Sequence, residues 1–171
     1  MDLGCGTGRD TLELLRRGWW VLAIDSQGEA IQGLRQYVEP LISSDRLETQ
    51  VADFESARWP TVDLVNASYS LPFSAPGSFA GLWERITASL SHGGRFCGQL
   101  FGENDEWAAR PPTFGGEWSS PPAMTFHSRA DVNELLHDFE AEQLIEVDED
   151  GVTAVGDAKH WHLFHVVARK S

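Results

Sequence analysis

The stretch Asp2-Leu3-Gly4-Cys5-Gly6-Thr7-Gly8 decides the fold of this 171-residue chain. A strand end comes first, three alternating glycines follow, and a helical pattern runs over residues 8–17. Glycine lets a ligand approach the backbone closely, and a helix N-terminus favours bound polar groups. A tight turn without a ligand is the plain alternative. The order strand, glycine turn, helix favours a ligand-binding loop.

The spacing of the glycines excludes two common kinds of nucleotide-binding loop. The dinucleotide fingerprint G-x-G-x-x-G/A needs glycine or alanine at its third position, and Arg9 and Thr11 stand there in the two registers. The phosphate-binding loop G-x-x-x-x-G-K-[ST] fails because no lysine follows. A nicotinamide-dependent oxidoreductase is therefore the less favoured enzyme class.

The rest of the chain alternates apolar runs with amphipathic stretches, which is typical of an α/β fold with a mostly parallel sheet and helices on both faces. Strands are expected at residues 19–24, 47–51, 62–67, 95–101, 143–147 and 160–168. Capping-box patterns predict helix starts at Ser26 and Ser128. The last two strands have no helix between them, so an antiparallel pair with a turn near residues 148–150 is expected. Core packing is expected for Trp19, Trp20, Trp161 and Cys97.

The pattern D-x-G-x-G-x-G of residues 2–8 resembles motif I of the class I S-adenosylmethionine-dependent methyltransferases. The resemblance implies one Rossmann-like domain over residues 1–171, with a seven-stranded sheet whose last strand is antiparallel. Residues 66–73 and 159–169 resemble the small tellurite- and thiopurine-methylating enzymes. In the family the first strand is longer than Met1-Asp2-Leu3, so a truncated first strand and a missing amino-terminal part are expected.

The resemblance also implies which residues bind S-adenosylmethionine. Asp25 would accept hydrogen bonds from the ribose, Asp53 and Phe54 would bind the adenine, and 66–69 would lie beside the transferred methyl group. The full set of expected cofactor-binding residues is Asp2, Gly4, Cys5, Gly6, Gly8, Asp25, Ser26, Asp53, Phe54, Asn66 and Tyr69. Asp25 as a helix-flanking acid and Asp53 as a solvated turn residue are the plain alternatives.

The acceptor side is expected around residues 103–128, which carry four prolines and no regular period. A segment this long is usually a lid or binding loop. Trp107 and Trp118 are expected to line an acceptor pocket or to pack on each other, and His160 and His162 are further pocket candidates. The sequence singles out no catalytic base. Two residues, Tyr69 and His127, are candidates to position or deprotonate the acceptor.

The implied reaction is in-line methyl transfer to a small molecule, with catalysis mainly by orientation. A non-catalytic cofactor-binding or partner protein of the same fold is the alternative. The net charge of −13 argues against a nucleic-acid partner, since that affinity needs Lys and Arg. Two cysteines and the absence of an apolar run of about 18 residues favour a cytoplasmic protein without a membrane partner. A monomer or homodimer is expected. No metal site is expected, because His165 lies on the opposite strand face from His160 and His162.

Overall fold

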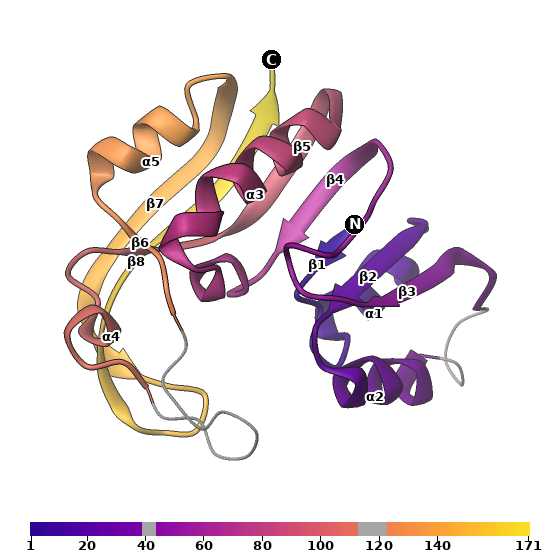
Figure 1. Cartoon of the computed structure of the whole chain (residues 1–171), viewed down its shortest axis with the longest axis horizontal. Coiled ribbons are helices and arrows are strands. Elements are labelled where there is room, and N and C mark those ends of the chain that lie inside the picture. The colour runs from indigo at the N-terminus through magenta and orange to yellow at the C-terminus, as the bar shows by residue number, and fades with distance from the viewer. Residues whose placement is uncertain (39–43, 113–122) are drawn as a thin grey trace.

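The computed structural model describes residues 1–38, 44–112 and 123–171. Within these residues one sheet has the strand order β3-β2-β1-β4-β5-β8-β7, and β6 pairs with the end of β5 (Figure 1). The strands are β1 (Asp2–Leu3), β2 (Val21–Asp25), β3 (Leu47–Val51), β4 (Val62–Ala67), β5 (Leu90–Gly102), β6 (Phe126–His127), β7 (Phe139–Val152) and β8 (Ala158–Lys170). β8 is antiparallel to both its neighbours, and the other pairs are parallel. The predicted α/β class, parallel sheet and closing antiparallel strand are confirmed.

Helices cover both faces of the sheet. They are α1 (Arg9–Arg16), α2 (Gly28–Val38), α3 (Pro76–Ser89), α4 (Glu106–Ala109) and α5 (Arg129–Leu135), with short 3-10 turns at Ser44–Arg46 and Leu71–Phe73. α1 and α2 pack against Val21 and Ala23 of β2. α3 and α5 cover the opposite face, where Phe96 and Phe164 are fully buried; Figure 1 shows α3 across β5. The Ser128 capping box is present as predicted and starts α5.

The face that carries α1 and α2 is covered unevenly. Residues paired across strands share one face of a sheet, and the register joins a single row across six strands. Its members, from β2 to β7, are Ala23, Asp2, Asn66, Cys97, Val167 and Gln143. Ala23 and Asp2 are buried beneath the helices, Asn66, Cys97 and Val167 are partly exposed, and Gln143 is exposed. Along this row the described residues leave the sheet uncovered from β4 to β7.

Several local predictions are wrong. Trp19 and Trp20 are 39% and 72% exposed, because β2 begins only at Val21 and both tryptophans lie in the connection after α1. The turn predicted near residues 148–150 is also wrong. β7 continues to Val152 and the chain reverses at residues 153–157, so the acidic residues lie within a strand that β8 partners.

The segment 103–128 has more regular structure than its composition indicates. It contains α4 and β6, whereas residues 113–122, with Trp118, lie outside the described residues. Asp105 starts α4 because its side chain accepts a hydrogen bond from the backbone N–H of Trp107. None of the helices described is both long enough and apolar enough to cross a membrane.

Candidate functional site

The glycine loop joins β1 to α1, and each glycine has its own physical reason. Gly4 has φ +76°, and a Cβ there would lie 2.2 Å from the Cβ of Ser70. Gly8 has φ +92°, and its Cβ would lie 2.7 Å from the Cγ of Leu34. Gly6 has φ +53° but open space where a Cβ would stand. The first and third glycines are required by packing, whereas the middle one leaves the backbone accessible to a ligand.

Asp2 ties the loop together from beneath. Its carboxylate accepts hydrogen bonds from Thr11 Oγ1 at 2.5 Å and from Asn66 Nδ2 at 2.9 Å, which joins β1, α1 and β4. Asp2 is 1% exposed, and this burial raises the pKa of its carboxyl above the usual value, against the effect of both hydrogen bonds. The neighbouring Cys5 is buried too, and burial raises the pKa of its thiol, which keeps it unreactive. Direct contact of either residue with a cofactor stays a prediction.

Asp25, at the end of β2, holds the open part of the loop. Its Oδ2 accepts from the backbone N–H of Gly6 at 2.9 Å, and its Oδ1 accepts from the N–H of Gln27 at 2.9 Å. A carboxylate has about four lone-pair sites, so both oxygens retain capacity for hydroxyl donors. Ser26 follows directly and is exposed. This geometry fits a ribose-binding acid beside a glycine loop.

Asp53 and Phe54 follow β3 at the same edge of the sheet, where Ala52 N–H bonds Asp25 O at 2.9 Å. Asp53 is exposed and its Oδ1 accepts from Ser56 N–H at 2.7 Å and Ser56 Oγ at 2.5 Å. These hydrogen bonds hold the pKa of the Asp53 carboxyl below its usual value. Phe54 is partly buried against the main core. Both residues lie at the predicted place, and adenine binding stays a prediction for them.

Tyr69 follows β4 and belongs to an aromatic group. Its φ of +53° is the one left-handed value of a non-glycine among the described residues, a conformation that costs free energy and often marks functional sites. The Tyr69 ring lies 6.4 Å from the rings of Phe101 and Trp161, and Trp107 lies 5.8 Å from Trp161. We call Tyr69, Phe101, Trp107 and Trp161 the aromatic group. Trp161, predicted as core, is partly exposed but packs against the buried cluster of Phe101, Met124 and Leu163. Cys97, also predicted as core, is partly exposed.

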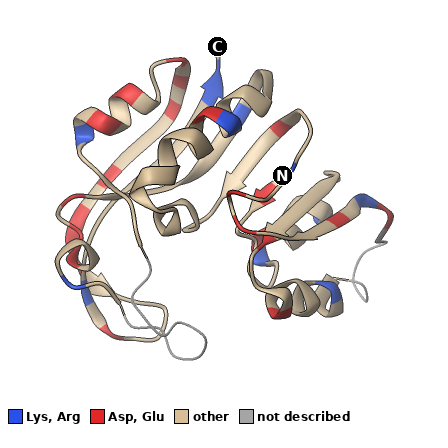
Figure 2. Cartoon of the chain, viewed as in Figure 1, with Lys and Arg blue, Asp and Glu red and all other residues tan. Residues whose placement is uncertain are grey.

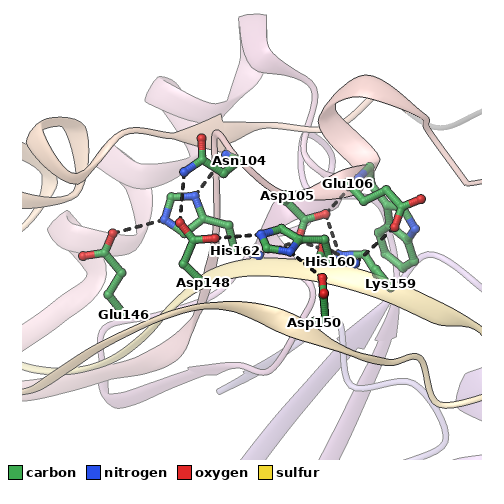
Figure 3. Close-up of polar contacts among 10 residues, drawn as sticks. Asn104, Asp105, Glu106, Glu146, Asp148, Asp150, Lys159, His160 and His162 are labelled. Atoms are coloured by element: carbon green, nitrogen blue, oxygen red, sulfur yellow. Dashed lines mark hydrogen bonds and ion pairs between the residues drawn. The ribbon is translucent and has the colours of Figure 1, made fainter.

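A buried ion pair holds this group, and the sequence did not reveal it (Figure 3). Lys159 Nζ lies 2.5 Å from both carboxylate oxygens of Asp105, and both side chains are at most 1% exposed. The ammonium also lies 3.7 Å from the ring centroid of Trp161 and 4.5 Å from that of Trp107. Burial lowers the pKa of Lys159 against the opposing effect of Asp105. The pair fixes α4 and the aromatic group to β8.

His160 and His162, expected in a pocket, instead join the β7–β8 hairpin, as Figure 3 shows. The two ring nitrogens of His160 contact Asp150 at 2.8 Å and Asp148 at 2.7 Å, and these carboxylates raise its pKa. His162 is 3% exposed, accepts from Asn104 N–H through Nδ1 and contacts Glu146 through Nε2. Among the described residues, no cluster could hold a metal ion.

His127 lies in β6, far inside the protein. It is 7% exposed, its ring lies 4.5 Å from that of Phe79 in α3, and burial lowers its pKa. α3 covers the sheet face opposite to α1, the helix that the glycine loop leads into. The structure therefore does not bring His127 together with the glycine loop. A role of His127 toward an acceptor stays a prediction.

Comparison with known proteins identifies the class. The family profile described as a methyltransferase domain matches residues 1–94, more than half of the chain, so the chain belongs to that family. Its fold is that of S-adenosylmethionine-dependent methyltransferases, in agreement with the predicted enzyme class and cofactor. No curated protein sequence matches it significantly.

Three similar solved structures cover 99% of this chain each. TehB from Haemophilus influenzae has a TM-score of 0.78 at 18% identity, and the chain spans 57% of its length. A methyltransferase from Methanosarcina mazei has a TM-score of 0.74 at 20% identity, with 90% of its length covered. The 1,6-didemethyltoxoflavin-N1-methyltransferase of Burkholderia thailandensis has a TM-score of 0.70 at 20% identity, with 69% covered.

Proposed function

We propose that this chain transfers a methyl group from S-adenosylmethionine to a small-molecule acceptor at the carboxyl ends of β1, β2 and β4. The observation that carries the proposal is the glycine loop itself. Gly6 leaves open space above its backbone, and its N–H is held by Asp25, whose carboxylate can accept further hydrogen bonds. The positive φ of Gly6 would favour glycine in a plain turn as well, so it is the open space beside Gly6, together with the free acceptor capacity of Asp25, that supports a ligand.

Each residue at this edge has a proposed task. When bound, S-adenosylmethionine supplies a methyl group that is already electrophilic. Asp25 would orient the ribose, and Asp53 with Phe54 would bind the adenine beside β3. Asn66 and Tyr69, at the end of β4, would lie against the reacting end of the cofactor. Asp2 acts beneath them by holding Asn66 at 2.9 Å.

The aromatic group would lie on the acceptor side. Orienting two reactants and excluding water can supply about 7–11 kcal/mol of a reaction barrier, and the proposed mechanism assigns no general base. A small acceptor agrees with the toxoflavin-type substrate named for the Burkholderia thailandensis protein. The net charge of −13 favours such an acceptor over a nucleic acid.

Calorimetry tests the cofactor assignment. S-adenosylmethionine and S-adenosylhomocysteine are expected to bind, and NAD and NADP are not. Asp25→Ala removes the clamp on Gly6 and should weaken binding at least tenfold, whereas Glu29→Ala removes an exposed acid one helical turn away and should not. Binding of the dinucleotides alone would refute the proposal.

Catalysis needs its own test, because a non-catalytic cofactor-binding protein would pass the first one. A panel of small acceptors is scored by release of S-adenosylhomocysteine. Release with at least one acceptor, abolished by Asp25→Ala, is expected. If S-adenosylmethionine bound tightly but no acceptor in a broad panel caused release, the non-catalytic alternative would replace the enzyme.

A further inference from the structure

The chain after β3 forms a single α-turn that begins at Asp53. The Asp53 carbonyl accepts from the N–H of Ala57 at 2.9 Å, and the Asp53 side chain caps the turn by accepting from the N–H of Ser56 at 2.7 Å. We call residues 53–57 the adenine turn, because Asp53 and Phe54 are the residues proposed above to bind adenine. One helical turn is too short to be stable by itself, so contacts from outside must hold it.

Two arginine side chains cap the carboxyl end of the adenine turn. A helical turn leaves its last four carbonyl groups without helical partners, and here the carbonyls of residues 54–57 accept from guanidinium groups instead. Arg85 donates from Nη1 to Phe54 O at 2.7 Å and from Nη2 to Ala57 O at 2.6 Å. Arg58 donates from Nη1 to the carbonyls of residues 55, 56 and 57 at 3.1, 2.9 and 2.9 Å. Every carbonyl of the turn therefore has a donor.

The two arginines tie the turn to different parts of the protein. Arg58 follows the turn directly, and its backbone N–H donates to Gln50 Oε1 of β3 at 2.9 Å. Arg85 belongs to α3, which is anchored in the main core by the neighbouring Ile86. The guanidinium carbon of Arg85 also lies 4.2 Å from the ring centroid of Trp59, within the range of a cation–π contact. Arg58 therefore joins the turn to the preceding strand, and Arg85 fixes it against the core.

Both guanidinium groups are used on neutral carbonyls although carboxylates are abundant. Acidic residues outnumber Lys and Arg by 26 to 13, and Figure 2 shows many of them along β7. Arg95, Arg129 and Arg169 form ion pairs with such acids, whereas within the described ranges no carboxylate lies at ion-pair distance from Arg58 or Arg85. A rigid fork of donors matches two fixed acceptors, which the compact ammonium of lysine cannot do. The contact of Arg85 with the turn therefore depends on its shape rather than on its charge.

We propose that Arg85 is a positioning residue for the adenine of S-adenosylmethionine. Arg85 acts through the adenine turn rather than by contact with the ligand. By holding the carbonyls of Phe54 and Ala57, it fixes the Asp53 carboxylate where the exocyclic amino group of adenine would donate a hydrogen bond. The role toward adenine rests on the proposed function, whereas the clamp on the turn rests on the geometry alone.

The clamp is tested first, on the ligand-free chain, by hydrogen exchange of backbone amides. Arg85→Lys keeps the charge but loses the fork, so the N–H of Ala57 is expected to exchange roughly tenfold faster than in the wild type. Arg16→Lys, the same exchange at an exposed position of α1, should leave it unchanged. The N–H of Leu12, bonded to Gly8 O in α1, reports global unfolding. Unchanged exchange at Ala57 in Arg85→Lys, or equal acceleration at Leu12, overturns the clamp.

The role toward adenine is tested with S-adenosylhomocysteine and its purine analogue, which lacks only the exocyclic amino group. Calorimetry of the wild-type chain is expected to show about tenfold weaker binding of the analogue, the effect of one hydrogen bond to a charged acceptor. In Arg85→Lys this affinity ratio should fall to about threefold or less, because Asp53 is no longer held in place. Arg16→Lys should keep the wild-type ratio. A protein that was merely destabilised would bind both ligands less well and keep the ratio, so an unchanged ratio in Arg85→Lys overturns the proposal.

A double variant tests whether Arg85 acts through Asp53. Asp53→Ala alone should bring the affinity ratio of the two ligands close to one. Adding Arg85→Lys to Asp53→Ala should then leave the ratio unchanged, since two residues that act through one group are not additive. A further fall of the ratio in the double variant would assign Arg85 an independent route to adenine and would overturn the proposal.

The two proposals fail separately. If the wild-type chain binds neither S-adenosylmethionine nor S-adenosylhomocysteine, the proposed function falls together with the role toward adenine, and exchange at Ala57 decides the clamp by itself. If the wild-type chain binds S-adenosylhomocysteine but does not distinguish it from the purine analogue, the proposed function stands and the role of Arg85 falls.

Discussion

Lys159→Met is expected to be one of the most destabilising single exchanges in this protein. The exchange keeps much of the side-chain length but removes the ammonium that contacts both oxygens of Asp105. The Asp105 carboxylate would remain buried, and its hydrogen bonds from the backbone N–H groups of Trp107 and His162 would be its remaining compensation. The three buried aromatic contacts of the ammonium would be lost as well.

The magnitude follows from the burial. Removing one partner of a buried ion pair costs about 3–5 kcal/mol, because an uncompensated charge remains. For a chain of this length, 1 kcal/mol corresponds to about 2–4 °C in Tm, so a fall of roughly 6–20 °C is expected. Adding Asp105→Asn to Lys159→Met removes the orphaned charge and should recover about 1–3 kcal/mol.

Urea unfolding followed by circular dichroism measures these free energies. Arg17→Met is the matched control, since it breaks an exposed i,i+4 pair with Glu13 and should cost less than about 0.5 kcal/mol. If Lys159→Met destabilised no more than Arg17→Met, or if the double variant were less stable than the single one, the pair would not stabilise the protein as described.

The remaining predictions concern the glycine loop and two histidines. Gly8→Ala should destabilise the protein by about 2–4 kcal/mol, because left-handed backbone strain is added to a clash with Leu34. Gly6→Ala meets open space and should cost about 1–2 kcal/mol of stability. It should also lower the affinity for S-adenosylmethionine, measured by calorimetry. Equal losses of stability would contradict this distinction. Burial lowers the pKa of His127, so just below pH 6.5 the unfolded chain binds more protons than the folded chain. The free energy of unfolding therefore falls when the pH is lowered through this range. His127→Phe should remove this loss of stability. Asp150 and Asp148 raise the pKa of His160 in the folded state. The stability that protonated His160 contributes is therefore present below pH 6.5 and is lost as the pH rises through the raised pKa, and His160→Gln should abolish this trend. The trends of the two histidines are opposite, so Tm measured between pH 5 and pH 8 distinguishes them.

The sequence predicted what depends on neighbouring residues. β3 and β4 have the expected bounds, and the Ser128 capping box starts α5. The glycine loop was found from its spacing, and Asp25 from the end of a predicted strand together with the resemblance to the methyltransferase family. These features are encoded within a few residues, where periodicity and capping chemistry are reliable.

The sequence missed what depends on residues far apart in the chain. Lys159 and Asp105 are 54 residues apart in the sequence, and the residues around neither of them form a pattern that predicts a buried ion pair. Arg85 looked like an ordinary helix residue, since the carbonyls that it holds lie 31 and 28 residues earlier in the chain. Trp20 was misplaced because an apolar run does not show where a strand begins. An alternation of polar residues on β5, with Cys97 and Gln99 on one face, was the available signal for the part of the sheet that the described residues leave uncovered.

The hydrogen bond from Tyr69 to Gln99 comes from the main chain, and this separates two properties of the protein. Any residue that tolerates a left-handed backbone, such as asparagine, aspartate or glycine, would supply the same N–H at position 69; proline alone lacks it. Exchanges there would change the ring contacts with Phe101 and Trp161 while the main-chain hydrogen bond to Gln99 of β5 stays in place. Descendants of this chain could thus acquire new side chains at position 69 and retain the same connection between the end of β4 and β5.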